Sequence, residues 1–129
     1  MNEAITHLVF VYGSLKAGYA LHGLLSHQTF EGTTQTTSDF RLYDLGRYPG
    51  LKRASVNGSS IRGEVYRIDD ECLRRLDDEE GVDDGLYTRE RIQLQAPFQF
   101  QAVWTYIYAG CVDNCPDCGS EWPRLPTDG

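Results

Sequence analysis

Short runs of β-branched and aromatic residues, separated by turn residues, constrain the fold of this chain more than any other feature. The first run, Ile5 to Tyr12, ends at Gly13-Ser14 and predicts a buried strand that leads into a tight loop. Further strand-like runs lie within residues 30–48, 59–68, 87–94 and 101–108. The sequence therefore predicts a strand-dominated domain.

Helical spacing occurs in two segments only. Residues 18–28 carry Leu21, Leu24 and Leu25 at helical spacing, which predicts a short helix. Asp69 or Asp70 can cap a second helix that ends near Gly81. The expected fold class is a mixed α+β domain with one or two short helices.

Turn residues divide the chain without marking a domain boundary. Tyr48-Pro49-Gly50 predicts a turn, and Asn57-Gly58 predicts a hairpin before the strand at 59–68. The length of 129 residues fits one domain, with a core at about 5–109 and a loop-rich tail at 110–129 that contains cysteines.

The net charge of −7 excludes some classes of protein. Phosphate contacts require clustered Lys and Arg, so we expect no nucleic-acid partner. No apolar run approaches the ~20 residues of a membrane span, and no basic stretch precedes the first apolar run. We therefore expect a soluble cytoplasmic protein without a membrane partner.

The acidic residues are concentrated in one segment. Residues 69–84 hold nine acidic and two basic residues. The net charge of this segment is therefore −7, the same as that of the whole chain. Most of these side chains fit a solvated helix end. A carboxylate that faced inward from this cluster would have a raised pKa, because burial and like charges both favour its protonated form. Such a group could transfer protons.

The loop Tyr12-Gly13-Ser14-Leu15-Lys16 is the second candidate site. A sharp turn after a strand can point successive backbone N–H groups into one concavity that binds a carboxylate, a phosphate or an oxyanion. Lys16 would add positive charge. An ordinary strand-to-loop turn explains the same residues.

Several segments together resemble the γ-glutamylcyclotransferase-like superfamily, most closely its γ-glutamylamine cyclotransferase branch. In chain order they are Val9 to Lys16, Gly63-Glu64-Val65-Tyr66, Leu76-Asp77-Asp78 with Glu80-Gly81, Tyr87 with Arg89, and Trp122. The resemblance extends from about Leu8 to Trp122.

The resemblance implies a small β-barrel with short flanking helices and a pocket at its mouth. It also implies that the α-amine of a small γ-glutamyl amide attacks its own γ-carbonyl, which releases 5-oxoproline and a free amine. The acid/base glutamate maps to Glu80, although the adjacent Glu79 could be the inward carboxylate. The substrate-holding residues map to Tyr12, Gly13, Ser14, Leu15, Lys16 and Tyr87. No cofactor is expected, and the protein could be a monomer or a homodimer.

Two alternatives stay open at this point. The chain could be a non-catalytic member of the fold that binds a small ligand or a partner. Cys111, Cys115 and Cys118 could hold zinc and stabilise the tail, since their spacing resembles a zinc knuckle. Reduced thiols, or one Cys115–Cys118 disulfide, explain the same residues.

Overall fold

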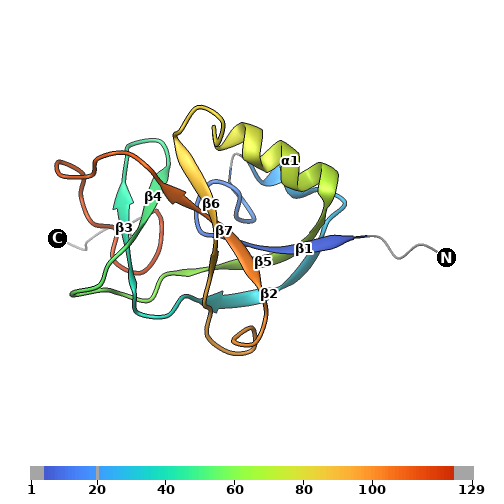
Figure 1. Cartoon of the computed structure of the whole chain (residues 1–129), viewed down its shortest axis with the longest axis horizontal. Coiled ribbons are helices and arrows are strands. Elements are labelled where there is room, and N and C mark those ends of the chain that lie inside the picture. The colour runs from blue at the N-terminus through green and yellow to red at the C-terminus, as the bar shows by residue number, and fades with distance from the viewer. Residues whose placement is uncertain (1–4, 20, 124–129) are drawn as a thin grey trace.

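A five-stranded sheet forms the centre of the computed structural model, which describes residues 5–19 and 21–123 (Figure 1). The strand order is β2-β5-β1-β7-β6, and a two-stranded hairpin, β3-β4, lies beside it. The strands are β1 (Thr6–Val11), β2 (Thr29–Gln35), β3 (Phe40–Asp44), β4 (Pro49–Arg53), β5 (Arg62–Asp69), β6 (Tyr87–Ile92) and β7 (Val103–Tyr108). The helices are η1, a 3-10 helix (His22–Leu25), and α1 (Asp70–Glu79).

The central strand is β1, which explains its continuous apolar sequence. It pairs antiparallel with β5 and parallel with β7. Leu8 and Phe10 belong to the apolar cluster on one face of the sheet, whereas Val9 and Val11 belong to the cluster on the other face. A strand that is buried on both faces cannot alternate with polar residues, so the predicted buried strand is confirmed.

The edge strands of the sheet approach each other at one end. A single bridge joins Thr36, just after β2, to Leu94, just after β6. The amide of Gln95 donates to the carbonyl of Gln35 at 2.9 Å, which strengthens this junction. The sheet is therefore strongly curled, and the mixed α+β fold class is confirmed.

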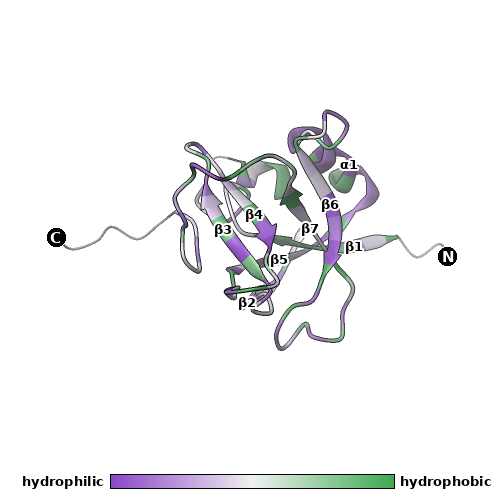
Figure 2. Ribbon diagram, turned by 60° about the vertical axis from the view of Figure 1, so that its left-hand side comes forward, coloured by the Kyte–Doolittle hydropathy of each residue, from purple (hydrophilic) through white to green (hydrophobic). Residues whose placement is uncertain are grey.

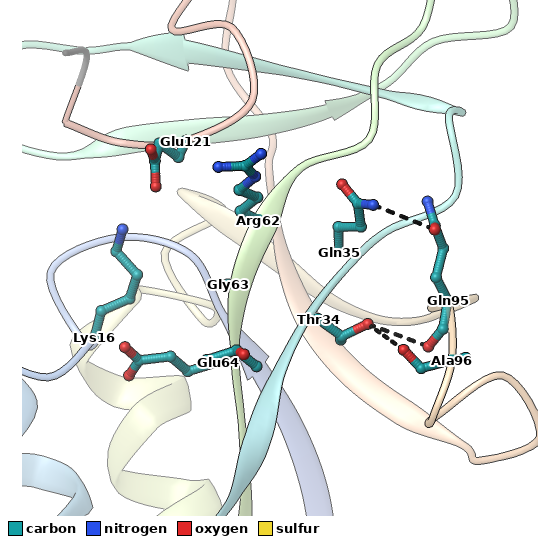
Figure 3. A pocket seen from close by; sticks show the side chains of 10 residues that line it. Lys16, Thr34, Gln35, Arg62, Gly63, Glu64, Gln95, Ala96 and Glu121 are labelled. Atoms are coloured by element: carbon teal, nitrogen blue, oxygen red, sulfur yellow. Dashed lines mark hydrogen bonds between the residues drawn. The ribbon is translucent and has the colours of Figure 1, made fainter.

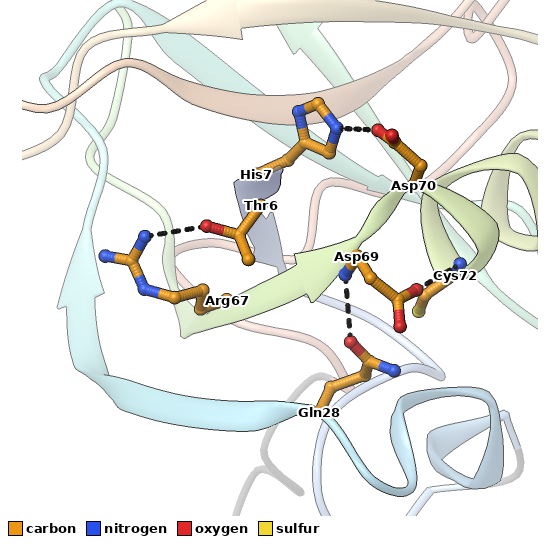
Figure 4. Close-up of polar contacts among 7 residues, drawn as sticks. All are labelled: Thr6, His7, Gln28, Arg67, Asp69, Asp70 and Cys72. Carbon is orange, nitrogen blue, oxygen red and sulfur yellow. Dashed lines mark hydrogen bonds and ion pairs between the residues drawn. The ribbon is translucent and has the colours of Figure 1, made fainter. Parts of the chain in front are cut away.

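Helix α1 covers one side of the sheet and packs against η1 (Figure 1). The side chain of Asp69 caps it by accepting a hydrogen bond from the amide of Cys72 at 2.8 Å (Figure 4). Its inner face buries Leu73 and Leu76, while much of its remaining surface is hydrophilic (Figure 2). The helix ends before Gly81, which has a φ of +65°. The predicted helix and its cap are confirmed.

Three local predictions need correction. In the described part of segment 18–28, the predicted helix is the single 3-10 turn η1. Pro49 is the first residue of β4, so the turn lies before it and not around it. A hydrogen bond from the amide of Leu45 to the carbonyl of Tyr48 closes this turn. Asn57-Gly58 does not join paired strands, because β4 pairs with β3 and β5 pairs with β1 and β2. A Cβ on Gly58 would lie 2.1 Å from the carbonyl oxygen of Ser38, so this glycine permits a close backbone approach.

The described part of the tail is irregular, as predicted, but it is fastened to the domain. The amide of Cys118 donates to Leu42 in β3 at 2.7 Å, and the amide of Asp44 donates to Pro116 at 2.8 Å. Further along, the amide of Arg62 donates to the carbonyl of Ser120 at 2.7 Å. The tail therefore forms one wall of the structure beside β3 and β5. Within residues 5–19 and 21–123, no helix has the length and apolar character needed to cross a bilayer.

The cap of α1 leads to a stability prediction. Replacing Asp69 with Ala removes the acceptor for the amide of Cys72, so we expect a loss of about 1 kcal/mol in the free energy of unfolding. Urea denaturation measures this loss. The matched control is Asp69→Asn, which keeps a capping oxygen and should lose much less. Equal stability of the two variants would show that the cap contributes nothing.

Candidate active site

A small cavity lies where the loop after β1 meets the end of α1 and the strands β6 and β7. Its enclosed volume is about 20 Å³, which is enough for roughly one water molecule. Six of the residues expected at a substrate site line it: Tyr12, Gly13, Ser14, Leu15, Glu80 and Tyr87. The structure thus brings together the loop and the acidic helix end, which are far apart in the sequence.

Glu80 is the only acidic residue that lines this cavity among the described residues. It follows the last residue of α1, and its amide donates to Leu76 at 2.9 Å. Its side chain is half-buried, whereas Glu79 is exposed. Burial, with a smaller contribution from the charge of Glu79, raises the pKa of Glu80 to about 7. Of the two glutamates left open by the sequence, the structure places Glu80 in the cavity.

Three tyrosines, Tyr12, Tyr87 and Tyr106, line the cavity with Glu80, and their hydroxyl groups already donate hydrogen bonds to other groups of the protein. Tyr12 donates to the carbonyl of Tyr106 at 2.5 Å, and Tyr87 donates to the carbonyl of Pro49 at 2.7 Å. Burial raises the pKa of all three phenols, and the charge of Glu80 adds to the effect. These phenols therefore stay neutral, and within the described residues the carboxylate of Glu80 has no hydrogen-bond or ion-pair partner.

Behind the cavity lies a polar network that the sequence analysis did not identify. The hydroxyl of Tyr106 donates to Asp77 Oδ1 at 2.7 Å, and Arg89 Nε donates to the same oxygen at 2.8 Å. Asp77 is part of the acidic cluster, but only the register that pairs Arg89 with Tyr106 brings the three together. Tyr48, which also lines the cavity, was missed because it lies in the hairpin turn before Pro49.

The loop after β1 is held tightly against Pro49. A Cβ on Gly13 would lie 2.7 Å from Pro49 Cγ, so no larger residue fits without a shift. The amide of Lys16 donates to the carbonyl of Gly13 at 3.0 Å and closes the turn. The amides of Ser14 and Leu15 have no acceptor among the described residues, so they remain available to an anion.

Lys16 does not join the other predicted residues. Its ammonium donates to the carbonyl of Trp122, and its side chain lines a different pocket. Burial lowers the pKa of Lys16, opposed by the charges of Glu121 and Glu64. The expectation that Lys16 lies with the other loop residues at the cavity therefore needs correction. The cause is the described tail, which offers this side chain a carbonyl acceptor.

The three tail cysteines lie in different surroundings. Cys118 is buried in the core, Cys115 is half-buried and Cys111 is exposed. Across the described ranges 5–19 and 21–123, no three His, Cys, Asp or Glu side chains are grouped so that they could hold a metal ion. Among the described residues, the three cysteines are therefore not grouped as a zinc-ligand set, and Cys118 is part of the apolar core.

Comparison with known proteins identifies the family of this chain. Residues 9–124 match the model of the family described as gamma-glutamyl cyclotransferase, AIG2-like. The chain belongs to this γ-glutamylcyclotransferase family, and the recognition made from the sequence motifs is confirmed at that level.

Individual relatives extend over most of the domain. A Vibrio cholerae protein named "Putative gamma-glutamylcyclotransferase" is 43% identical over 103 residues, which cover 79% of this chain and 82% of the relative. A rat gamma-glutamylaminecyclotransferase is 35% identical, and the match covers 67% of this chain and 62% of the rat protein. A mouse AIG2-like protein of known structure superposes with a TM-score of 0.76 at 28% identity, covering 96% of this chain and 90% of the mouse chain. The bacterial relative is more similar than the rat enzyme, so these matches define the family without singling out the γ-glutamylamine branch.

The contact between Gly13 and Pro49 leads to a prediction about stability. In Gly13→Ala the new methyl group meets the proline ring, so we expect the free energy of unfolding to fall by about 1–3 kcal/mol. Gly23→Ala is the matched control, because a Cβ there meets nothing within 4 Å. Urea denaturation of both variants compares them. Equal stability would show that the loop does not pack on Pro49.

The raised pKa of Glu80 predicts a pH dependence of stability. Between pH 4.5 and about 7 the folded protein keeps a proton on Glu80 that the unfolded chain has lost. The free energy of unfolding therefore falls as the pH rises through this window, by at most about 3 kcal/mol. Glu80→Gln removes this contribution, so the difference in stability between wild type and variant should change with pH. A constant difference from pH 4 to about 8 would contradict the raised pKa.

Proposed function

We propose that this protein cleaves a small γ-glutamyl amide by intramolecular cyclisation and releases 5-oxoproline and a free amine. The observation that carries the proposal is the half-buried carboxylate of Glu80, which lines the cavity without a side-chain partner in the described chain and has a pKa of about 7. A carboxyl group with this pKa can both accept and donate a proton near neutral pH. Membership in the γ-glutamylcyclotransferase family supports the choice of reaction.

Each proton in this reaction can pass through Glu80. The carboxylate first takes a proton from the substrate α-ammonium, because only the free amine is nucleophilic. The amine nitrogen then forms a bond to the γ-carbonyl carbon, and the carbonyl oxygen becomes an oxyanion. When the carbon–nitrogen bond of the amide breaks, the leaving nitrogen takes this proton from Glu80. The ring nitrogen still carries one proton too many, and this second proton passes through Glu80 to the released amine in the same way, which gives 5-oxoproline and an ammonium ion. The carboxylate is thereby regenerated, and no water is consumed.

The loop after β1 supplies the complementary charge. The amides of Ser14 and Leu15 lack acceptors among the described residues and lie in a loop that lines the same cavity as Glu80. They are the donors we assign either to the oxyanion or to the α-carboxylate of the substrate. Tight packing of Gly13 on Pro49 holds the loop in place before substrate binds. The loop is therefore preorganised, and ring closure gains from positioning.

Entry of the substrate requires a change at the mouth of the cavity. The enclosed space of about 20 Å³ is smaller than a glutamyl group. Tyr48 lines the cavity, is 40% exposed and contacts the ring of Tyr87 at a centroid distance of 6.5 Å. We assign Tyr48 as the side chain that moves aside when the glutamyl group binds.

The amine half of the substrate is assigned by similarity alone. We propose a γ-glutamylamine, on the basis of the motifs in this sequence and the 35% identity with the rat gamma-glutamylaminecyclotransferase. A panel of γ-glutamyl amides distinguishes this choice from the other substrates. It includes γ-glutamyl amides of simple amines, γ-glutamyl amides of single amino acids, and glutathione. Preferred turnover of a γ-glutamyl amino acid would overturn the choice and leave the reaction type intact.

The reaction predicts opposite behaviour for the two adjacent glutamates. Glu80→Gln should lower 5-oxoproline release by a factor of about 10²–10⁴, because the amide cannot accept a proton. Glu79→Gln is the matched control and should retain nearly full activity, since Glu79 is exposed. Chromatographic measurement of 5-oxoproline with the panel of amides provides the rates. Full activity of Glu80→Gln would exclude the proton transfer, and inactive wild type that still binds the amides would identify a non-catalytic member of the fold.

A further inference from the structure

A second, larger pocket lies on the other side of the loop after β1. It is open, has a volume of about 430 Å³, and lies among β2, β5, the loop at Lys16 and the tail (Figure 3). None of its lining residues lines the cavity that holds Glu80. The two sites meet at one point of the chain, where Leu15 lines the cavity and Lys16 lines the pocket.

Two cationic side chains reach this pocket from different elements. Lys16 is only 9% exposed, and its ammonium donates to the carbonyl of Trp122. That bond occupies one of the three hydrogens of the ammonium group. Arg62 comes from the start of β5, and its guanidinium has no hydrogen bond or ion pair with any other described residue. Both groups can therefore donate to an anionic ligand group.

Two carboxylates line the same pocket, so a simple anion is not the ligand that fits it best. Glu64 accepts hydrogen bonds through Oε1 from the amide of Ala17 at 2.9 Å and from the hydroxyl of Tyr66 at 2.8 Å. These bonds fix the carboxylate and leave its other oxygen available. Glu121 lies across the pocket in the tail, and Figure 3 shows Lys16 between the two glutamates. A ligand that contacts both the cations and the carboxylates of this pocket therefore carries both signs of charge.

The remaining wall is polar and already held in place. Gln95 Nε2 donates to the carbonyl of Thr36 and to Ser60 Oγ, both at 3.0 Å. Gln95 Oε1 in turn accepts from Gln35 Nε2 at 3.3 Å (Figure 3). The carbonyl oxygen of the Gln35 side chain has no donor among the described residues. This wall therefore offers an acceptor to a polar side chain of the ligand.

We propose that this pocket is a binding site for a zwitterionic α-amino acid with a polar side chain. The carboxylate of the ligand lies between Lys16 and Arg62, its ammonium group is bound by the available oxygen of Glu64, and its side chain faces Gln35. Opposite charges held in one pocket match the two charges of the ligand backbone. The volume of about 430 Å³ falls within the range of small-molecule sites. This site is independent of the reaction proposed for Glu80.

Direct binding to the full chain tests the site without any activity assay. The probes are L-asparagine, L-serine and L-lysine, titrated into the protein and followed by calorimetry and by NMR shifts of the residues that line the pocket. We avoid glutamine as a probe because it is itself a γ-glutamyl amide. At least one probe should bind. The methyl ester and the N-acetyl derivative of that probe should each bind at least 10-fold more weakly, since each lacks one of the two charges.

Three variants locate the binding site. Arg62→Gln should weaken binding by about 10-fold or more, because it removes a charged donor. Arg74→Gln, which removes an exposed arginine from α1, is the matched charge control and should bind normally. Glu80→Gln should also bind normally, because Glu80 lies in the other site. The proposal is overturned if no probe binds, if Arg62→Gln binds as well as wild type, or if Glu80→Gln abolishes binding.

Discussion

The burial of β1 on both faces is the constraint on which the rest of this structure depends. Its pairing with β5 and β7 places the strand at the centre of the sheet, and apolar clusters cover both of its sides. A strand held in this way resists slipping, because a shift of one residue would move every side chain to the other face and out of the cluster in which it packs. The loop at residues 12–16 therefore leaves the sheet at a fixed point, and the packing of Gly13 on Pro49 fixes its path.

The position of Glu80 depends on how helix α1 packs against the sheet. The buried leucines of α1 fix the rotation of the helix against the sheet, and the helix ends so that Glu80 faces the loop after β1. Asp77 accepts hydrogen bonds from Tyr106 and Arg89 one turn earlier, which ties the helix end to β6 and β7. The charge of Asp77 is thus compensated, whereas that of Glu80 is not. Two carboxylates three residues apart in the chain therefore have different roles.

Local sequence patterns predicted much of this molecule. The strand before Gly13, the helix with Asp69 as its cap and the two C-terminal strands follow from residue periodicity and capping chemistry. The prediction of a hairpin at Asn57-Gly58 was wrong, because strand pairing depends on the whole sheet. The same two residues instead allow the backbone to pass close to Ser38. The exclusion of Lys16 from the cavity could not be predicted, because the carbonyl of Trp122 that binds it lies 106 residues away in the sequence. For the same reason, only the register of β6 and β7 identifies Tyr106 as part of the site.

The most direct test of the account is the pH dependence of kcat/KM for a γ-glutamyl amide that the enzyme turns over. This parameter reports the ionisation of groups in the free enzyme and the free substrate. Glu80 must be a carboxylate to accept the first proton, so kcat/KM should rise with pH and level off through an apparent pKa of about 7. The exposed Glu79 should have no part in this limb, so Glu79→Gln should show the same profile. If kcat/KM stayed constant between about pH 6 and 8, the assignment of Glu80 as the group that transfers the proton would be contradicted.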